Sequence, residues 1–361
     1  MKKRGQRGAI VAVLLIGLLI FGGVYFAWTT VIDVFQPVNT DQGKTVTIVI
    51  QSGDDARQIA DELQAKGIIR NALAFRIWAR IKGLDTHLQA GAYNLNTSMT
   101  IDSIIGQLLN AQPDEYVVSV PEGSRIEQVV QRLGAAGLPK FKTQEFLKYT
   151  KNPAQFPDAA RYPILKSIPS GDSMEGLLFP DTYLIPVNAT ARDVVNMMLT
   201  EFNDKVQQNH LEALAHKNHL SLFQMVILAS IVEREVIFDK DRPLVASVYW
   251  NRIYMPNAET VGLLNADPTV QYARDSQPGT TTYWKPLQDV GVNIAPDSPW
   301  NTYIHKGFPP TPICNPGLAS MIAASTPART EYYFFLSKKD GTNVYAKTLA
   351  EFEADKQKYL P

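Results

Sequence analysis

The sequence has very few of the residues that build metal centres and disulfide frameworks. Its 361 residues include one cysteine, Cys314, and five histidines. A single cysteine excludes an internal disulfide framework and a cysteine-rich zinc site. Among the histidines only His216 and His219 stand at helical spacing, and no further ligand follows at the spacing of zinc motifs. We therefore expect no metal site.

The chain also lacks an excess of charge of either sign. Its 35 basic residues are balanced by 35 acidic residues, and only 19% of all residues are charged. Because nucleic-acid binding depends on clustered lysines and arginines, this composition argues against a nucleic-acid partner. Phosphate-binding loops, serine nucleophile elbows and zinc-protease motifs are missing as well. The length is roughly two to three times the usual domain size, which predicts more than one folded unit.

The N-terminus is where charge is unevenly placed. Basic residues at positions 2, 3, 4 and 7 precede an uncharged run over 8–32, and the core of that run, 9–28, has 20 residues. As a helix this core is about 30 Å long and spans a bilayer. It is too long for a typical signal peptide and has no small-x-small cleavage site, which favours a permanent anchor. Positive charge before the run predicts a cytoplasmic N-terminus and an extracytoplasmic chain after it, where a cofactor-dependent enzyme is not expected.

The segment after the anchor repeats a pattern of strand, turn and helix. Residues 46–50 have strand character, residues 52–54 break it, and a helical pattern follows. A second copy appears 70 residues later, with matched pairs Ile48 and Val118, Ile50 and Val120, Gly53 and Gly123, Ile59 and Val129, and Leu63 and Leu133. Units of this kind place helices on one side of a small sheet. Two copies indicate a recognition arm.

The stretch from Ser221 to Glu235 carries the clearest chemical signal. A capping box formed by Ser221 and Gln224 opens a run that is apolar on all sides, which predicts a buried helix. Burial and the negative end of the helix dipole both raise the pKa of a carboxyl at its C-terminus, and a general acid needs such a pKa. Glu233 and Glu235 lie about 200° apart around the axis, so they cannot act as a close pair. Periodicity does not decide between them, and two solvated helix-end residues balanced by Arg234 remain the alternative.

Other reactive combinations are weaker. Cys314 and His305 could form a nucleophile and base, but a lone cysteine in a loop is more often a small apolar residue. Asp267 precedes Pro268 and could equally form a turn. The region 260–316 is rich in Pro, Gly, Asn and Thr, which predicts long ordered loops over a helical base, and such loops often carry function.

Several short runs along the chain carry a recognisable set of motifs: 88–93, 121–123, 175–183, 229–235, 245–252, 266–272 and 301–317. In this order they resemble the YceG-like family of endolytic murein transglycosylases. The resemblance implies an α+β protein with a single N-terminal transmembrane helix, LysM-like β/α modules and a mixed, mainly helical catalytic domain with long loops. The expected divisions are a cytoplasmic tail over 1–8, the transmembrane helix over 9–32, a tether over 33–45, the LysM-like arm over 46–140, an irregular connector over 141–171 and the catalytic domain over 172–361.

The resemblance also implies an activity. The second glutamate of the Glu-x-Glu pair, Glu235, is the expected catalytic acid and base, and Glu233 is expected to support it. Further cleft candidates in the matching runs are Glu175, Asp267, Thr269, Tyr272 and Tyr303. The implied reaction cleaves the bond between N-acetylmuramic acid and N-acetylglucosamine within nascent glycan strands, forms 1,6-anhydro ends and so ends strand elongation.

The implied partners are peptidoglycan strands, the inner membrane that holds the anchor, and peptidoglycan synthases. A non-catalytic wall-binding scaffold is the alternative function, and hydrolysis to reducing ends is the alternative reaction.

Overall fold

The structure, a computed structural model, describes residues 35–40, 43–50, 54–83, 91–110, 115–287 and 291–360. The expected transmembrane helix over 9–32 lies outside these residues. Within the described ranges, none of the helices is both long enough and apolar enough to cross a membrane. The chain divides into two units, the first formed by 1–117 with 184–187 and the second by 118–183 with 188–361. The division runs through the expected arm at 46–140.

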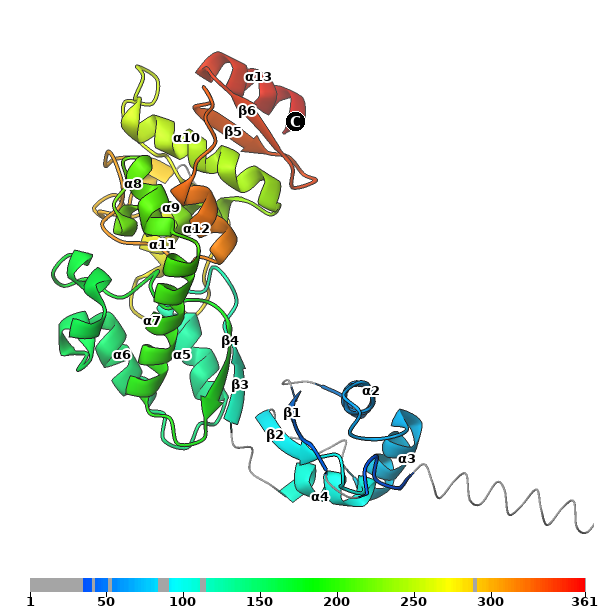
Figure 1. Ribbon diagram of the computed structural model, residues 1–361. Helices are drawn as coiled ribbons and strands as arrows, with labels where there is room; N and C mark the ends of the chain where they lie inside the picture. The colour runs from blue at the N-terminus through cyan, green and yellow to red at the C-terminus, as the bar shows by residue number, and fades with distance from the viewer. Residues whose placement is uncertain are drawn as a thin grey trace, which may run out of the picture. The chain divides into compact units, whose positions relative to one another are not determined.

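Unit 1 is a small α/β unit (Figure 1). Its first two strands pair antiparallel, from Thr45 opposite Asn96 to Ile50 opposite Gly91. The sheet order is β1-β2-β3-β4, and the last two strands are the ones through which the unit boundary passes. The elements are β1 (Thr45–Ile50), α2 (Ala56–Ala65), α3 (Ala72–Lys82), β2 (Gly91–Asn96), α4 (Ile101–Asn110), β3 (Glu115–Ser119) and β4 (Thr182–Pro186).

Local sequence explains the helices of unit 1. Asp55 caps α2, because its side chain accepts hydrogen bonds from the Arg57 and Gln58 amides. Asn71 caps α3 in the same way, and Gly83 ends α3 in the left-handed conformation that suits glycine. The apolar faces of α2, α3 and α4 pack on β1 and β2 in one core. The expected β-turn-α pattern is present in both copies, as β1 with α2 and as β3 with α5.

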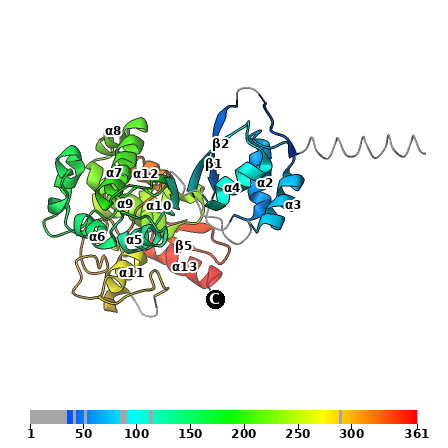
Figure 2. The ribbon, with the colours of Figure 1, turned by 90° about the horizontal axis from the view of Figure 1, so that it is seen from below.

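Unit 2 is mainly helical, and α9 lies at its centre (Figures 1 and 2). Helices α8, α10, α11 and α12 all pack against α9. The elements are α5 (Ile126–Ala135), α6 (Thr143–Lys151), α7 (Ala191–Gln208), α8 (Leu211–Lys217), α9 (Leu222–Glu235), α10 (Arg242–Tyr254), α11 (Asp267–Asp275), α12 (Leu318–Ser325), β5 (Phe334–Ser337), β6 (Asn343–Ala346) and α13 (Leu349–Tyr359). The strands β5 and β6 form a hairpin that contacts α13, and β5 also contacts α10.

The expected connector over 141–171 is not irregular. It contains α6 and the 3-10 helices Pro153–Gln155, Ala159–Arg161 and Pro163–Ser167. Ring contacts hold the segment together, including Phe156 with Tyr149 at 5.5 Å and with Tyr162 at 6.3 Å between centroids. The three 3-10 helices have too few residues to show an apolar period, which is why the pattern missed them.

An acidic side chain links the start of α10 to the hairpin. Helix α10 begins with Pro243 in its first turn, and the Asp241 side chain does not cap it. Asp241 instead accepts a hydrogen bond from the Tyr345 hydroxyl at 3.0 Å. The side chain therefore joins β6 to the start of α10, while the proline supplies the helical backbone angle.

Candidate active site

Helix α9 presents a carboxylate at each side of its C-terminal end. The predicted capping box is present, since Ser221 Oγ accepts from the Gln224 amide at 3.2 Å and Gln224 Oε1 accepts from the Ser221 amide at 2.9 Å. Every residue of the helix from Met225 to Val232 is buried. The helix ends at Glu235, and Val236 is extended. A buried helix of this kind holds its terminal side chains at fixed positions.

Glu235 is held by a tyrosine from the neighbouring helix. The Tyr249 hydroxyl donates a hydrogen bond of 2.5 Å to Glu235 Oε1. Tyr249 is 1% exposed and Glu235 is half-buried, so a buried partner orients the carboxyl. This is the arrangement that a group exchanging protons with a bound substrate requires.

Arg252, one turn after Tyr249 on α10, also acts on the Glu235 carboxyl. Arg252 Nε donates to the Tyr333 carbonyl at 2.7 Å, and its Nη1 donates to the Leu264 carbonyl. These backbone acceptors fix the guanidinium of Arg252, which is 7% exposed. Its charge acts on Glu235 through space and opposes the effect of burial.

Burial raises the pKa of Glu235 to about 7, and the nearby charge of Asp267 acts in the same direction. The hydrogen bond from Tyr249 and the charges of Arg252 and Arg234 act in the opposite direction. A carboxyl with this pKa populates both protonation states at neutral pH. Glu235 can therefore donate a proton and then accept one.

Two of the predicted cleft residues lie beside Glu235. The Tyr303 hydroxyl donates to Asp267 Oδ1 at 2.5 Å, which joins the start of α11 to the loop that follows it. Burial and the Asp267 carboxylate raise the pKa of the Tyr303 hydroxyl. Asp267 is exposed and Tyr303 is half-buried, so both are open to a ligand.

Glu233 has a different environment. Its side chain is 8% exposed, and its Oε2 lies 3.3 Å from Arg242 Nη1. The same oxygen accepts a hydrogen bond of 3.1 Å from the amide of Gly317, the residue that caps α12. A carboxylate is favourable at a helix N-terminus. Glu233 therefore joins α9, α10 and α12, and the two glutamates do not share a site, as their spacing predicts.

Glu175 is a buried structural residue and does not line a cleft. It is 0% exposed, and its Oε1 accepts hydrogen bonds of 3.1 Å from the Ile126 amide and from Asn315 Nδ2. Burial raises its pKa to about 8. Since Ile126 is the first residue of α5, Glu175 caps that helix and ties it to the loop before α12.

Thr269 and Tyr272 are also buried, on α11. The Thr269 hydroxyl donates to the Ala266 carbonyl at 2.7 Å and lies 2.8 Å from the Thr302 hydroxyl. The Arg125 guanidinium lies over the Tyr272 ring at 4.2 Å, and Tyr272 is 5% exposed. Both residues hold the loops around α11 in place, which corrects the expectation that they line the cleft.

Comparisons with known proteins show the family of this chain. Residues 48–358 match the YceG-like family. The chain belongs to this family. It is 32% identical over 356 residues to a protein of Bacillus subtilis (strain 168) named endolytic murein transglycosylase, with 95% of this chain and 91% of that protein covered. A protein of the same name from Streptococcus pneumoniae (strain D39) is 27% identical over 354 residues, which cover 93% of this chain and 62% of that protein's length.

A solved structure is similar as well. The crystal structure of a YceG-like protein from Listeria monocytogenes matches with a TM-score of 0.59 at 28% identity. The match covers 86% of this chain and 98% of that one. The similarity therefore extends over nearly all of a known family member.

The sequence pattern did not predict Tyr249 as a partner of Glu235. Tyr249 and Arg252 stand three positions apart on α10, and such residues share a helix face. Two polar groups on one face of a buried helix are a usable signal, but this signal does not show which carboxylate they contact.

The alternative nucleophile is excluded, because Cys314 is buried, donates to the Ser230 carbonyl at 3.3 Å and has a thiol pKa raised by burial.

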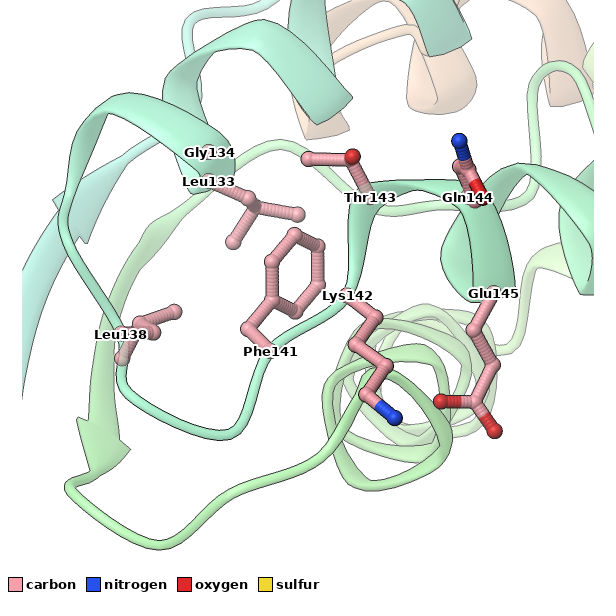
Figure 3. A pocket seen from close by; sticks show the side chains of 8 residues that line it. All are labelled: Leu133, Gly134, Leu138, Phe141, Lys142, Thr143, Gln144 and Glu145. Carbon is pink, nitrogen blue, oxygen red and sulfur yellow. The ribbon is translucent and has the colours of Figure 1, made fainter.

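A separate cavity does not compete with this site. A hollow of about 520 Å³ lies between α5 and α6, and Figure 3 shows the Phe141 ring beside Leu133 within it. Its charged lining residues are Lys142 and Glu145, and Glu145 accepts a hydrogen bond of 2.8 Å from Tyr149. One acid and one base of this kind do not form a catalytic arrangement.

Proposed function

We propose that this protein is a membrane-anchored endolytic murein transglycosylase in which Glu235 is both catalytic acid and catalytic base. Membership of the YceG-like family and relatives that bear this name support the activity. The observation that carries the residue assignment is the half-buried Glu235, whose carboxyl accepts a hydrogen bond from Tyr249 and has a pKa of about 7. Glu233, the other candidate, is occupied by Arg242 and Gly317.

In the first step, protonated Glu235 donates its proton to the glycosidic oxygen between N-acetylmuramic acid and N-acetylglucosamine. The bond from that oxygen to C1 of the muramic residue then breaks, and positive charge develops at C1. Tyr249 stabilises the carboxylate that remains, because its hydroxyl donates to Oε1.

In the second step, the Glu235 carboxylate accepts the proton of the muramic 6-hydroxyl while the oxygen of that hydroxyl attacks C1. A 1,6-anhydro ring forms and the enzyme returns to its starting protonation state. Most glycosidases need two carboxylates, one of which activates water or forms a covalent bond. Here the substrate supplies the nucleophile, so one carboxyl performs both proton transfers.

Asp267 favours one alternative reaction. It is an exposed carboxylate whose charge acts on Glu235, so the pair could instead activate water and release reducing ends. Its hydrogen bond from Tyr303 supports a positioning role, in which the two side chains contact the sugar.

The proposal places the enzyme at the cell membrane. The run over 9–32, with basic residues before it, would anchor the chain with a cytoplasmic N-terminus and an extracytoplasmic catalytic unit. The order β1-α2-α3-β2 in unit 1 is consistent with a LysM-like module that binds glycan. An enzyme held there would meet strands as synthases extend them, and its cleavage would end their elongation.

The test uses full-length protein in detergent with un-crosslinked glycan strands of known length. Mass spectrometry should show 1,6-anhydro ends, and early products should be fragments from the strand interior. The Glu235→Gln variant should form none. Reducing ends that disappear in Asp267→Asn would favour hydrolysis, and strand binding without cleavage by the unaltered protein would favour a scaffold.

A further inference from the structure

The outer face of α3 carries an apolar stripe. Leu73, Ile77 and Ile81 are 60%, 52% and 65% exposed. Their spacing of four residues places them on one side of the helix over about 12 Å of its axis. Single exposed leucines are ordinary, but a continuous stripe on a helix of 11 residues indicates a surface that something covers.

Two arginines border the stripe. Arg76 and Arg80 are exposed, and at 100° per residue they lie with the stripe in an arc of about 140°. The helix contains no acidic residue, and its opposite face is buried in the core of unit 1 through Phe75 and other side chains. A face that combines aliphatic side chains with arginines fits an anionic bilayer, where apolar groups enter the acyl boundary and guanidinium groups meet phosphates.

This face lies next to the start of the described chain. The Phe35 ring contacts the Trp78 ring of α3, with 5.8 Å between centroids. Arg70 Nε and Nη2 donate to the Pro37 carbonyl at 3.0 and 2.9 Å, which fixes the following residues too. The proposed anchor ends at residue 32, and three residues span at most about 11 Å. Because Phe35 is fixed on Trp78, the anchor would hold α3 close to the membrane surface.

A second copy of the chain fits the face less well. In a symmetric pair the same patch meets itself. Arg76 and Arg80 would then face the same arginines of the other copy, with no acidic residue on α3 to balance them.

We propose that Leu73, Ile77 and Ile81, with Arg76 and Arg80, dock on the extracytoplasmic surface of the anionic bilayer that holds the anchor. The inference rests on the proposed anchor at 9–32. Docking would hold unit 1 in one orientation on the membrane instead of leaving it free to rotate about its tether.

The test places a polarity-sensitive fluorophore at position 77 through Ile77→Cys. Labelling is selective because the one native cysteine, Cys314, is buried. The full-length chain is reconstituted in nanodiscs of phosphatidylglycerol and phosphatidylcholine, and Ala65→Cys on the exposed surface of α2 is the matched control. The label at position 77 should shift to the blue and lose several-fold in quenching by aqueous iodide, relative to the label at position 65.

Two variants test the cause. The double variant Arg76→Gln/Arg80→Gln should restore much of the iodide quenching at position 77. Nanodiscs of phosphatidylcholine alone should restore it as well. Arg57→Gln, which removes an exposed cation of α2, should leave it unchanged. Equal quenching at both positions in an inserted chain would overturn the docking while the anchor stands. A chain that does not co-elute with nanodiscs would overturn both the docking and the anchor. If position 77 is protected from iodide in detergent, and this protection depends on protein concentration, the face binds a second copy.

Discussion

The two ends of the Glu-x-Glu pair show how differently one helix can use the same residue type. Both are half-buried. On one side Glu235 receives a hydrogen bond from the Tyr249 hydroxyl. On the other side Glu233 is bound by the Arg242 guanidinium and by the Gly317 amide. Helix geometry decides which side each carboxylate faces. The partners decide whether it can exchange a proton or only joins helices.

The largest expected effect is at Glu235. Replacing it with Gln removes the proton donor and acceptor but keeps an oxygen for Tyr249, so the fold should persist. General acid and base catalysis contributes about 10²- to 10⁴-fold, and we expect a loss of this size in the initial rate of glycan cleavage. Circular dichroism of the variant should match that of the unaltered protein. Residual activity within ten-fold of normal would remove Glu235 from the chemistry.

Glu175 tests whether a raised pKa alone marks a catalytic carboxyl. Its pKa is about 8 in the folded protein against an ordinary value of 4.5, so the folded state keeps a proton that the unfolded state loses between these pH values. Its contribution to stability is therefore present below about pH 4.5 and is lost as pH rises towards 8.

Glu175→Gln has no proton to lose, so it should reduce the fall in stability between pH 5 and pH 8 by about 2–4 kcal/mol, at about 1.4 kcal/mol per pKa unit. Urea unfolding followed by tryptophan fluorescence at both pH values measures this. Cleavage at pH 6 should stay near normal, since the side chain is fully buried. A cleavage loss as large as that of Glu235→Gln would show that burial does not separate the two residues.

Glu233→Gln should affect stability more than chemistry. The change leaves Arg242, which is 7% exposed, without its charged partner on α9. We expect a loss of about 1–3 kcal/mol in the free energy of unfolding, because the Gln oxygen still accepts but hydrogen bonds to a neutral group are weaker than those to a carboxylate. Cleavage per folded molecule should remain within a few-fold of normal. Unchanged stability together with lost cleavage would contradict the structural role.

Tyr249→Phe should move the pH profile. The lost hydrogen bond lowers the pKa of Glu235 in the unaltered protein, so its removal should raise that pKa above about 7. Cleavage requires protonated Glu235 and declines as pH rises through this pKa, so the declining limb should move to higher pH. The lost orientation should cost about 1 kcal/mol, or roughly five-fold in rate at pH 6. A limb that moves to lower pH would contradict the assignment.

Asp267→Asn should have the smallest effect, in the opposite direction. The charge of Asp267 raises the pKa of Glu235, so the variant should lower that pKa and move the declining limb to lower pH. The Asn oxygen still accepts from Tyr303, and the rate at pH 6 should change by about two-fold, as for a weak charge interaction. A loss comparable to that of Glu235→Gln would instead make Asp267 a second catalytic carboxylate.

Helices with a clear apolar period were predictable from the sequence. The prediction of a buried helix over 221–236 is confirmed by α9 at Leu222–Glu235, and the opposite sides of Glu233 and Glu235 follow from 3.6 residues per turn. One-turn helices in the expected connector were not predictable, because they carry too few positions to show a period.

The site was only partly predictable. Asp267 and Tyr303 lie near Glu235, and their contact with the sugar stays a prediction. The sequence does not distinguish an acid, a threonine or a tyrosine that faces a cleft from one that faces the interior, so the burial of Glu175, Thr269 and Tyr272 was not predictable. One of the partners that separate Glu233 from Glu235 is distant along the chain, since Gly317 is 84 positions from Glu233. Pairings over such distances depend on how helices pack, which no local pattern contains.

The most direct test compares Glu235→Gln and Glu233→Gln in one assay, with 1,6-anhydro ends counted by mass spectrometry and corrected for the folded fraction. We expect Glu235→Gln to form almost no anhydro ends and Glu233→Gln to form them at a rate within a few-fold of normal. Anhydro ends that persist in Glu235→Gln and vanish in Glu233→Gln would contradict the assignment of the chemistry to Glu235.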